Sequence, residues 1–394
     1  MRTSVIGIGL VALTVGATAQ AAGQGLTFDA RRIGMGGLSL GRSASLMRYN
    51  AAYGAVPEAA DRRGRPRVTI PIPLGIIQFL HDHPHLSTDP AFHPDSAGFN
   101  PILVANTLLN PGFGIKGVRV SVLGWLHYDL GVQLNDNLLA FLRDSIEAQA
   151  RTGYGVFGNG IVEGGFAPTV SYAGRVAGDS STGLYVGGAL HYYLGAAYVR
   201  SSIGAGFATG DSIFTGPNPV TPRDSGLTSY SKPGNALGHG VGGDVGVAWI
   251  SGPIELGIGV NDIGATLTWS DTRQDSVFYR DSTFSKPVAN HVSTTTKLPV
   301  SYVANVTYTI GKTTLGADVL NTGRGATVHV GGEQRLGLIA LRGGIARDQR
   351  KRIEFGWGGG VRLGPLGLDV GFWTHTNSLS NERGVTMATS FSIY

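Results

Sequence analysis

Residues Ile353–Leu363 read IEFGWGGGVRL, and side chains of opposite character alternate along this stretch. Successive residues of a β-strand point to opposite faces, so a strand here has one apolar face and one small or polar face. The apolar face carries Ile353, Phe355, Trp357, Gly359, Val361 and Leu363, and the other carries Glu354, Gly356, Gly358, Gly360 and Arg362. The same period recurs in Leu184–Tyr198, Ile254–Asn261 and Leu366–Trp373. The sequence therefore predicts an all-β protein.

A soluble β-sandwich and a transmembrane β-barrel share this alternation. Charged residues make up only 14% of the 394 residues, and 62 residues are glycine, which suits a crowded lumen better than a solvated exterior. After residue 22, no apolar run reaches the roughly 18 residues that a transmembrane helix needs. We therefore expect an outer-membrane β-barrel of about 14 antiparallel strands. Aromatic residues near strand ends are expected to form interfacial girdles: Tyr192, Tyr193, Tyr198, Trp249, Trp269, Tyr302, Tyr308, Trp357 and Trp373.

The first 21 residues have the features of a secretory signal peptide. Arg2 is followed by the apolar run Val5–Val15 and by small residues around Ala19. Sec-dependent export of a barrel predicts the outer membrane of a Gram-negative cell. The chain contains no cysteine, which excludes a lipid-anchored lipoprotein, disulfides and thiolate metal sites. Its 31 basic and 26 acidic residues are spread along the sequence, so nucleic acid is not an expected partner.

The mature chain divides into two parts. Residues 22–66 contain few alternating runs and read as an irregular or partly helical segment, and residues 67–394 contain the barrel. Residues 134–150 predict a short amphipathic helix, because leucine or isoleucine recurs there every four residues. Stretches rich in turn-forming and polar residues predict long external loops at 79–114, 201–235 and 271–291.

The segment Asp29–Tyr53 contains a GMGG motif (Gly34, Met35, Gly36 and Gly37), then small residues, then Asn50. On these residues the chain resembles the FadL-type outer-membrane transport superfamily, especially its PorV-like and TraF-like branches. Those branches have Asn-Pro-Ala where this chain has Asn50-Ala51-Ala52. Further resemblance lies in Gly240–Ile263, with Asp244 and the run Asn261-Asp262-Ile263-Gly264, in Gly331–Ile345, and in 352–376.

The resemblance implies a barrel of about fourteen strands whose N-terminal segment folds into the lumen as a hatch. The hatch and its ligand-binding residues would centre on Gly34, Met35, Gly36, Gly37 and Asn50. Some members of the superfamily carry hydrophobic molecules such as long-chain fatty acids across the outer membrane. PorV-like members instead act with a secretion machine.

The inward strand faces are expected to carry charges of both signs. Such charges either pair and brace the wall or line a hydrophilic path, and we favour bracing. The lumen-facing candidates are Glu255, Glu333, Arg335, Arg342, Glu354, Arg352, Arg362, Asp318 and Asp369.

Two patterns suggest other chemistry. His81, His83 and His85 would share one face of an extended chain, which suits a metal ion, although a polar loop explains them as well. Gly37–Gly41 matches the G-x-S-x-G pattern around Ser39, but that motif needs a preceding strand, and this Gly-rich stretch does not predict one. We therefore expect no catalytic residue, metal or cofactor.

Three functions follow from these observations. The first is passive passage of small, hydrophobic molecules through a barrel in contact with outer-membrane lipid. The second is a PorV-like accessory barrel that docks secretion-machinery or exported proteins. The third is an outer-membrane lipid hydrolase that uses Ser39, and it is the least favoured.

Overall fold

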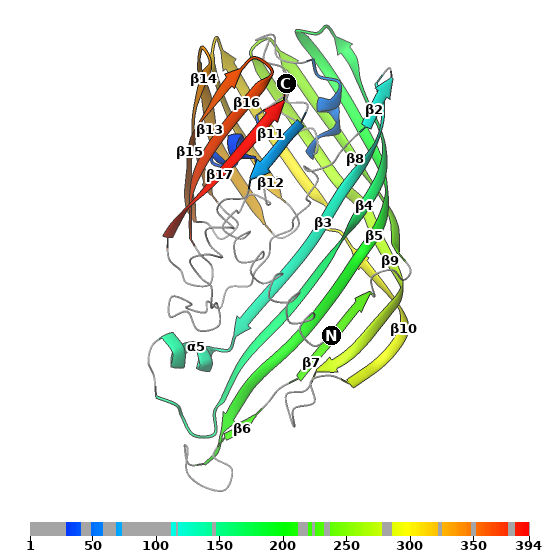
Figure 1. Cartoon of the computed structure of the whole chain (residues 1–394), viewed down its shortest axis with the longest axis vertical. Coiled ribbons are helices and arrows are strands. Elements are labelled where there is room, and N and C mark those ends of the chain that lie inside the picture. The colour runs from blue at the N-terminus through cyan, green and yellow to red at the C-terminus, as the bar shows by residue number, and fades with distance from the viewer. Residues whose placement is uncertain are drawn as a thin grey trace.

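The computed structural model forms one antiparallel sheet that curls into a barrel (Figure 1), as the strand pattern predicts. None of the helices that the structure describes is long and apolar enough to cross a membrane. The structure describes residues 29–40, 49–57, 68–72, 112–115, 117–143, 147–211, 220–222, 225–231, 237–277, 286–321, 325–347, 352–376 and 383–393.

Seventeen strands and three short helices lie within these residues. The helices are α2 (Ala30–Ile33), the 3-10 helix η1 (Ala51–Gly54) and α5 (Asp136–Arg143). The first strands are β1 (Val68–Ile72), β2 (Gly112–Ile115), β3 (Val118–Leu134), β4 (Gly153–Gly178), β5 (Thr182–Thr209), β6 (Val220–Pro222), β7 (Ser225–Ser231), β8 (Gly238–Ser251) and β9 (Ile254–Val277). The others are β10 (Lys286–Lys297), β11 (Ser301–Ile310), β12 (Thr313–Asn321), β13 (Ala326–Leu336), β14 (Ile339–Arg347), β15 (Ile353–Leu363), β16 (Leu366–Thr376) and β17 (Arg383–Ile393).

Fourteen of the strands follow one another around the wall. Antiparallel ladders run from β2 through β3, β4, β5, β8 and β9 to β11, and then in chain order to β17, which pairs with β1. The remaining three strands, β6, β7 and β10, extend one side of the wall by pairing with the far halves of β5 and β9. Figure 1 shows this extension, together with α5, at the bottom of the view.

Short hairpins identify the two ends of the barrel. Two-residue turns begin with a glycine of positive φ at Gly252, Gly311, Gly337 and Gly364, a backbone conformation that favours glycine. The C-terminal residue of β17, Ile393, pairs with Leu366 beside the last of these turns. Short turns lie on the periplasmic side of outer-membrane barrels, so the C-terminus lies there and the extension points outward.

The connection between β4 and β5 lies at the same end and is closed by one carboxylate. Asp179 Oδ1 accepts hydrogen bonds from the hydroxyl and the amide of Ser181 and from the amide of Thr182. The hydrogen bond from the Ser181 hydroxyl and those from the two amides hold the pKa of Asp179 below its ordinary value. This turn is therefore formed most completely when Asp179 is ionised.

Exposure alternates along the strands as a membrane barrel requires. On β14, Leu341 and Ile345 point outward, whereas Ala340, Arg342 and Ala346 are buried. The outward residues on the wall strands are mostly Val, Ile, Leu, Phe and Trp, the composition that contacts lipid. The low overall charge of the chain therefore reflects a surface that cannot be hydrated.

Helices α2 and η1 lie inside the barrel and form the hatch, which we define as residues 29–40 and 49–57 (Figure 1, blue). Helix α2 lies against β15, β16 and β17, and η1 against β4, β5 and β8. Two apolar clusters pack the hatch against the wall, and a third lies within the hatch. The first two are Ala30 and Ile33 with Trp373 and Ala388, and Tyr53 with Tyr185, Ile250, Val303 and Leu320. The third is Met35 with Leu38 and Leu40.

Glycines of the wall let the hatch backbone approach the sheet directly. A Cβ atom added to Gly344 would lie 2.0 Å from the Met35 carbonyl oxygen, and one added to Gly259 would lie 2.0 Å from the Tyr49 carbonyl oxygen. Gly356 and Gly371 meet Ile33 and Ala30 in the same way. Part of the glycine excess is thus explained by contacts in which no side chain fits.

Several sequence expectations need correction. The helix expected at 134–150 is only α5, and residues 147–150 are not helical. The stretches 201–235 and 271–291, expected as loops, contain the end of β5, all of β6 and β7, the end of β9 and the start of β10. The 79–114 loop overlaps β2. These strands lie largely in the extension, where no lipid-facing apolar row marks them.

Outward-facing positions are testable with a single charge. Ile345 is 49% exposed on the outer face of β14. We expect Ile345→Arg to lower the free energy of unfolding by about 2–4 kcal/mol, the cost of arginine near the bilayer midplane. Urea unfolding in phosphocholine vesicles measures this, with Ile345→Leu as the control. Equal stability of the two variants would mean that this face does not contact lipid.

Two neighbouring glycines test the docking of the hatch. Gly344→Ala should force the wall and the Met35 carbonyl apart, at about 1–3 kcal/mol for the overlap. Gly343 is the matched control, because a Cβ there meets no atom within 4 Å. We expect trypsin to cleave Gly344→Ala at Arg31 or Arg32 faster than Gly343→Ala, as read by N-terminal sequencing. Identical cleavage rates would contradict the docking.

Candidate functional site

The GMGG motif forms the turn that follows α2. Asp29 caps the helix by accepting a hydrogen bond from the Arg31 amide (3.0 Å), and Gly34 is the C-cap. Gly36 and Gly37 then take φ values of +67° and +91°, and Met35 is 2% exposed. A Cβ on Gly36 would lie 2.8 Å from backbone atoms of Gly344 and Ile345. The motif thus reverses the chain against the wall with only backbone between them.

Asn50 has the corresponding role for η1. Its side-chain oxygen accepts from the Ala52 amide (3.0 Å), and its Nδ2 donates to the Val247 carbonyl of β8 (2.9 Å). Asn50 is therefore the N-cap of η1. Ala51 is the first residue of η1, a position that proline would also tolerate. The Asn50 cap explains how η1 begins here without a proline.

The run Asn261-Asp262-Ile263-Gly264 forms a bulge in β9 opposite β8, and the two strands remain paired on both sides of it. Register shifts occur between Val241 and Val245 of β8, opposite this run. Asp262 has φ of +59°, and its amide donates to Asp244 Oδ1 (2.9 Å). Asn261 Nδ2 donates to the Tyr49 carbonyl of the hatch (2.9 Å). The run therefore forms the bulge in the wall and also binds the hatch to the wall at Tyr49.

The GMGG half and the Asn50 half of the hatch also contact each other. The guanidinium carbon of Arg32 lies 5.6 Å from the centre of the Tyr49 ring, and Arg32 Nε donates to the Gly37 carbonyl (2.5 Å). The Tyr53 hydroxyl accepts from Asn305 Nδ2 of β11 (2.7 Å). Arg32 is 4% exposed, so its charge is satisfied within the hatch.

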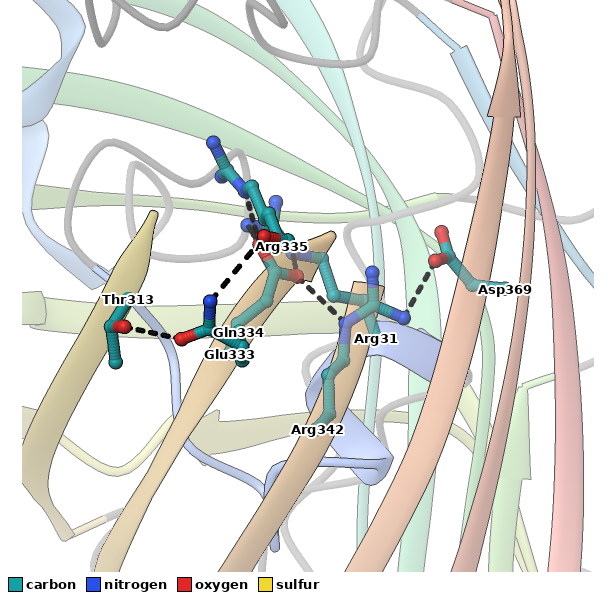
Figure 2. A network of polar contacts seen from close by, with 7 residues as sticks. All are labelled: Arg31, Thr313, Glu333, Gln334, Arg335, Arg342 and Asp369. Carbon is teal, nitrogen blue, oxygen red and sulfur yellow. Dashed lines mark hydrogen bonds and ion pairs between the residues drawn. The ribbon is translucent and has the colours of Figure 1, made fainter. Parts of the chain in front are cut away.

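A cluster of five charged residues joins α2 to the wall near the periplasmic end (Figure 2). Glu333 of β13 accepts from Arg31 (2.9 and 3.0 Å), from Arg342 of β14 (2.7 Å) and from Arg335 (2.7 Å). Arg342 Nη1 also lies 2.6 Å from Asp369 Oδ1 of β16. Glu333 is 2% exposed. A buried carboxylate that three guanidiniums share is a strong tether between the hatch and the barrel.

The other predicted lumen-facing residues also lie on the inner face. Glu354 is buried and accepts a hydrogen bond from Trp373 Nε1 (3.0 Å). Glu255 is buried at the start of β9. Arg362 Nε donates to the Gly364 carbonyl (3.1 Å) at the β15–β16 turn. The structure thus brings Arg335, Arg342, Asp369 and Arg362 together, and places Glu255 and Glu354 elsewhere.

Three inward-facing histidine–carboxylate pairs were not anticipated from the sequence. His127 Nδ1 lies 2.8 Å from Glu163, His191 Nε2 lies 2.7 Å from Asp244, and His329 Nδ1 bonds Asp318. Each pair joins neighbouring strands. Predicting that these partners lie opposite one another requires the strand register, and the periodicity of the sequence does not give that register.

The pair at His191 could be taken for a catalytic triad, since Nδ1 lies 2.8 Å from the Thr169 hydroxyl. That hydroxyl, however, donates to the Ala167 carbonyl (2.9 Å). The Thr169 hydroxyl is thus shared between the imidazole and a main-chain carbonyl of its own strand, and all three side chains are buried. The three residues brace β4, β5 and β8.

Ser39 does not sit in a nucleophile elbow. It follows α2 and a turn, not a strand, and its amide donates to Asp318 Oδ2 (2.8 Å). Among the described residues, neither the Ser39 hydroxyl nor His329 Nε2 has a hydrogen-bond partner. The serine hydroxyl and the imidazole are therefore not joined as a base and nucleophile would be.

Metal ligation finds no support among the described residues, where no group of three or more His, Asp or Glu side chains could hold an ion. The weak candidates His81, His83 and His85 lie outside the described residues.

An aromatic cluster fills the inner face of the wall where the extension begins. The Trp125 and Tyr193 rings meet edge to face at 5.6 Å, and Trp269 stacks on Tyr198 at 5.1 Å. The Trp269 ring lies against Gly195 and Gly238, whose Cβ positions it would occupy. The cluster consists of Leu123, Trp125, Ala167, Tyr193, Tyr198, Ala265, Leu267, Trp269 and Leu298.

The cluster corrects the expectation of aromatic girdles. Tyr193, Tyr198, Trp269 and Trp373 are buried inside the barrel. The outer face instead carries Tyr192, Trp249, Tyr302, Tyr308 and Trp357.

A hydrogen-bonded chain crosses the lumen beside this cluster. Trp269 Nε1 donates to the Thr296 hydroxyl (3.1 Å), and that hydroxyl donates to Glu163 Oε2 (2.5 Å). Glu163, fully buried, also bonds His127. The chain joins β9, β10, β4 and β3, so the buried polar groups at this level pair with one another among the apolar rings.

No protein-family profile matches the sequence, and no curated protein matches it. Among solved structures, the toluene transporter TbuX of Ralstonia pickettii is similar over 95% of this chain and 100% of its own, with 10% identity and a TM-score of 0.41. The toluene transporter TodX of Pseudomonas putida is similar over 72% and 80%, with 10% identity and a TM-score of 0.36. A Rhodopseudomonas blastica porin variant is similar over 70% and 100%, with 10% identity and a TM-score of 0.23.

The charged tether can be tested at its centre. Glu333→Gln leaves Arg31 and Arg342 without the carboxylate that they share, so we expect a loss of about 3–5 kcal/mol of stability. Asp211→Asn is the control, because the Arg151–Asp211 pair is exposed and worth at most about 1 kcal/mol. Urea unfolding in vesicles measures both. A small, equal loss in the two variants would show that Glu333 is not a tether.

Proposed function

We propose that this chain is an outer-membrane barrel that passes small hydrophobic molecules passively, with the hatch closing its periplasmic half. The observation that carries the proposal is the aromatic cluster on the inner wall. A lumen built to pass ions or sugars would present hydrated polar groups to the solute. Here the rings of Trp125, Tyr193, Tyr198 and Trp269 pack on one another inside the wall and are buried, so a solute that parts them meets apolar surface.

The pairing of the polar lumen groups supports the same proposal. Glu333, Asp369, Glu163, Asp244 and Asp318 all bond side chains of the barrel or the hatch. Removing such groups from their partners to hydrate a passing ion is costly. An apolar solute requires no such exchange, since it displaces only contacts between apolar side chains.

Passage requires movement, because the hatch fills the lumen below the cluster. Its contacts with β13–β16 are largely backbone against glycine, while the Arg31–Glu333 tether fixes one point. Either the hatch shifts or the wall opens sideways. We favour hatch movement, and the absence of cysteine from the chain offers a way to test it.

The experiment locks the hatch with one engineered disulfide. The Ala30 amide donates to the Ser390 hydroxyl (2.8 Å), so the two backbones are neighbours, and Ala30→Cys with Ser390→Cys is the pair chosen for cross-linking. We expect uptake of radiolabelled naphthalene by Gram-negative cells to rise when the chain is expressed. Oxidation of the double variant should return uptake to the level of the empty host, and reduction should restore it, while each single variant is unaffected.

Two results would count against the proposal. Uptake by the oxidised, fully cross-linked barrel at the wild-type rate would exclude the hatch as the gate. No uptake above the empty host, together with co-purification of exported proteins, would favour the accessory barrel that docks secreted proteins.

A further inference from the structure

A cavity lies beside the charged cluster, at the inner rim of the periplasmic mouth. Its lining reaches Leu338 in the β13–β14 turn and Gly367 just after the β15–β16 turn. Arg31 and Arg335 are each 20% exposed there. The site is therefore reached from the periplasmic side without crossing the aromatic cluster.

The charge of the cavity lining is unbalanced. Its charged residues are Arg31, Arg335, Arg342, Arg362, Glu333 and Asp369. These described residues comprise four guanidiniums and two carboxylates, a formal excess of two positive charges. Both carboxylates already accept from arginine, Glu333 from three and Asp369 from Arg342. The formal charge of the lining itself is thus positive, at a mouth that anions reach from solution.

We propose that this cavity binds the oxyanion of a small ligand, a carboxylate or a phosphate, at the periplasmic mouth. Guanidinium groups present N–H donors in a planar fork that matches both oxyanions. The enclosed space is small, about 30 Å³, and Leu338 borders its open side. An apolar group attached to the anion therefore lies outside this space, against the exposed Leu338 side chain. Binding here needs no passage through the barrel, so this inference stands apart from the proposed function.

Calorimetric titration of the full chain in a non-ionic detergent tests the site with matched probes. Benzoate and benzamide have nearly the same shape and differ in charge. We expect benzoate to bind, benzamide not to bind, and the benzoate affinity to fall as sodium chloride rises, since salt screens the attraction. Inorganic phosphate that competes with benzoate identifies a general oxyanion site, and phosphate that does not compete identifies a carboxylate site.

Arg362→Gln is the informative variant, because it leaves the Arg31–Glu333 and Arg342–Asp369 pairs in place. Losing one charge-assisted hydrogen bond should weaken benzoate about tenfold or more. Arg347→Gln is the control, since Arg347 is exposed at the opposite end of β14 from the cavity. Heat-modified mobility in electrophoresis verifies that both variants fold. Equal binding of benzoate and benzamide, no binding of either anion, or unchanged benzoate affinity in folded Arg362→Gln would overturn the proposal.

Discussion

The structure depends on one steric constraint, the direct contact of the hatch backbone with the wall. At Gly344, Gly356 and Gly371 the two main chains lie closer than any side chain would permit. The barrel can therefore hold a folded segment without widening, and the turn at Gly36 and Gly37 follows from the same need. Glycine normally weakens a strand, and here that cost is offset by the packing it allows.

The second organising feature is the pairing of charged side chains on the inner face of the barrel. Carboxylates on the inner face are bonded to arginine, histidine or tryptophan of neighbouring strands or of the hatch. Each pair fixes the register of two strands as well as satisfying buried polar atoms. The result is a wall braced by ion pairs near the periplasmic end and an apolar lining farther out. The same arginines that brace the wall also leave the mouth positive.

Sequence periodicity predicts the membrane part of the fold closely. The alternation in Ile353–Leu363 coincides with β15, and that in Leu366–Trp373 lies within β16. The reason is that lipid permits only apolar residues on the outer face. The first half of β4 and all of β6 escaped prediction, because beyond the bilayer neither face is forced to be apolar.

The site is less accessible to sequence reasoning. The GMGG turn and Asn50 were found from resemblance, and alternation placed Arg335, Arg342 and Asp369 on inner faces. The role of Arg31 was missed, because it lies in a segment with no period. Trp269 was assigned to an interfacial girdle, since an aromatic ring suits either a membrane surface or a lumen lined by glycine. Only the packing against Gly195 and Gly238 decides between them.

The unequal lengths of the strands have a consequence for where a solute first meets the protein. Strand β14 has 9 residues, about 30 Å along its axis, which at a tilt of about 40° covers about 23 Å and nearly matches the apolar band of roughly 25 Å. Strand β5 has 28 residues, about 90 Å along its axis. Even with the same tilt, one side of the wall stands several tens of ångströms above the lipid. A molecule approaching from outside meets this tall side well before it reaches the hydrocarbon of the membrane.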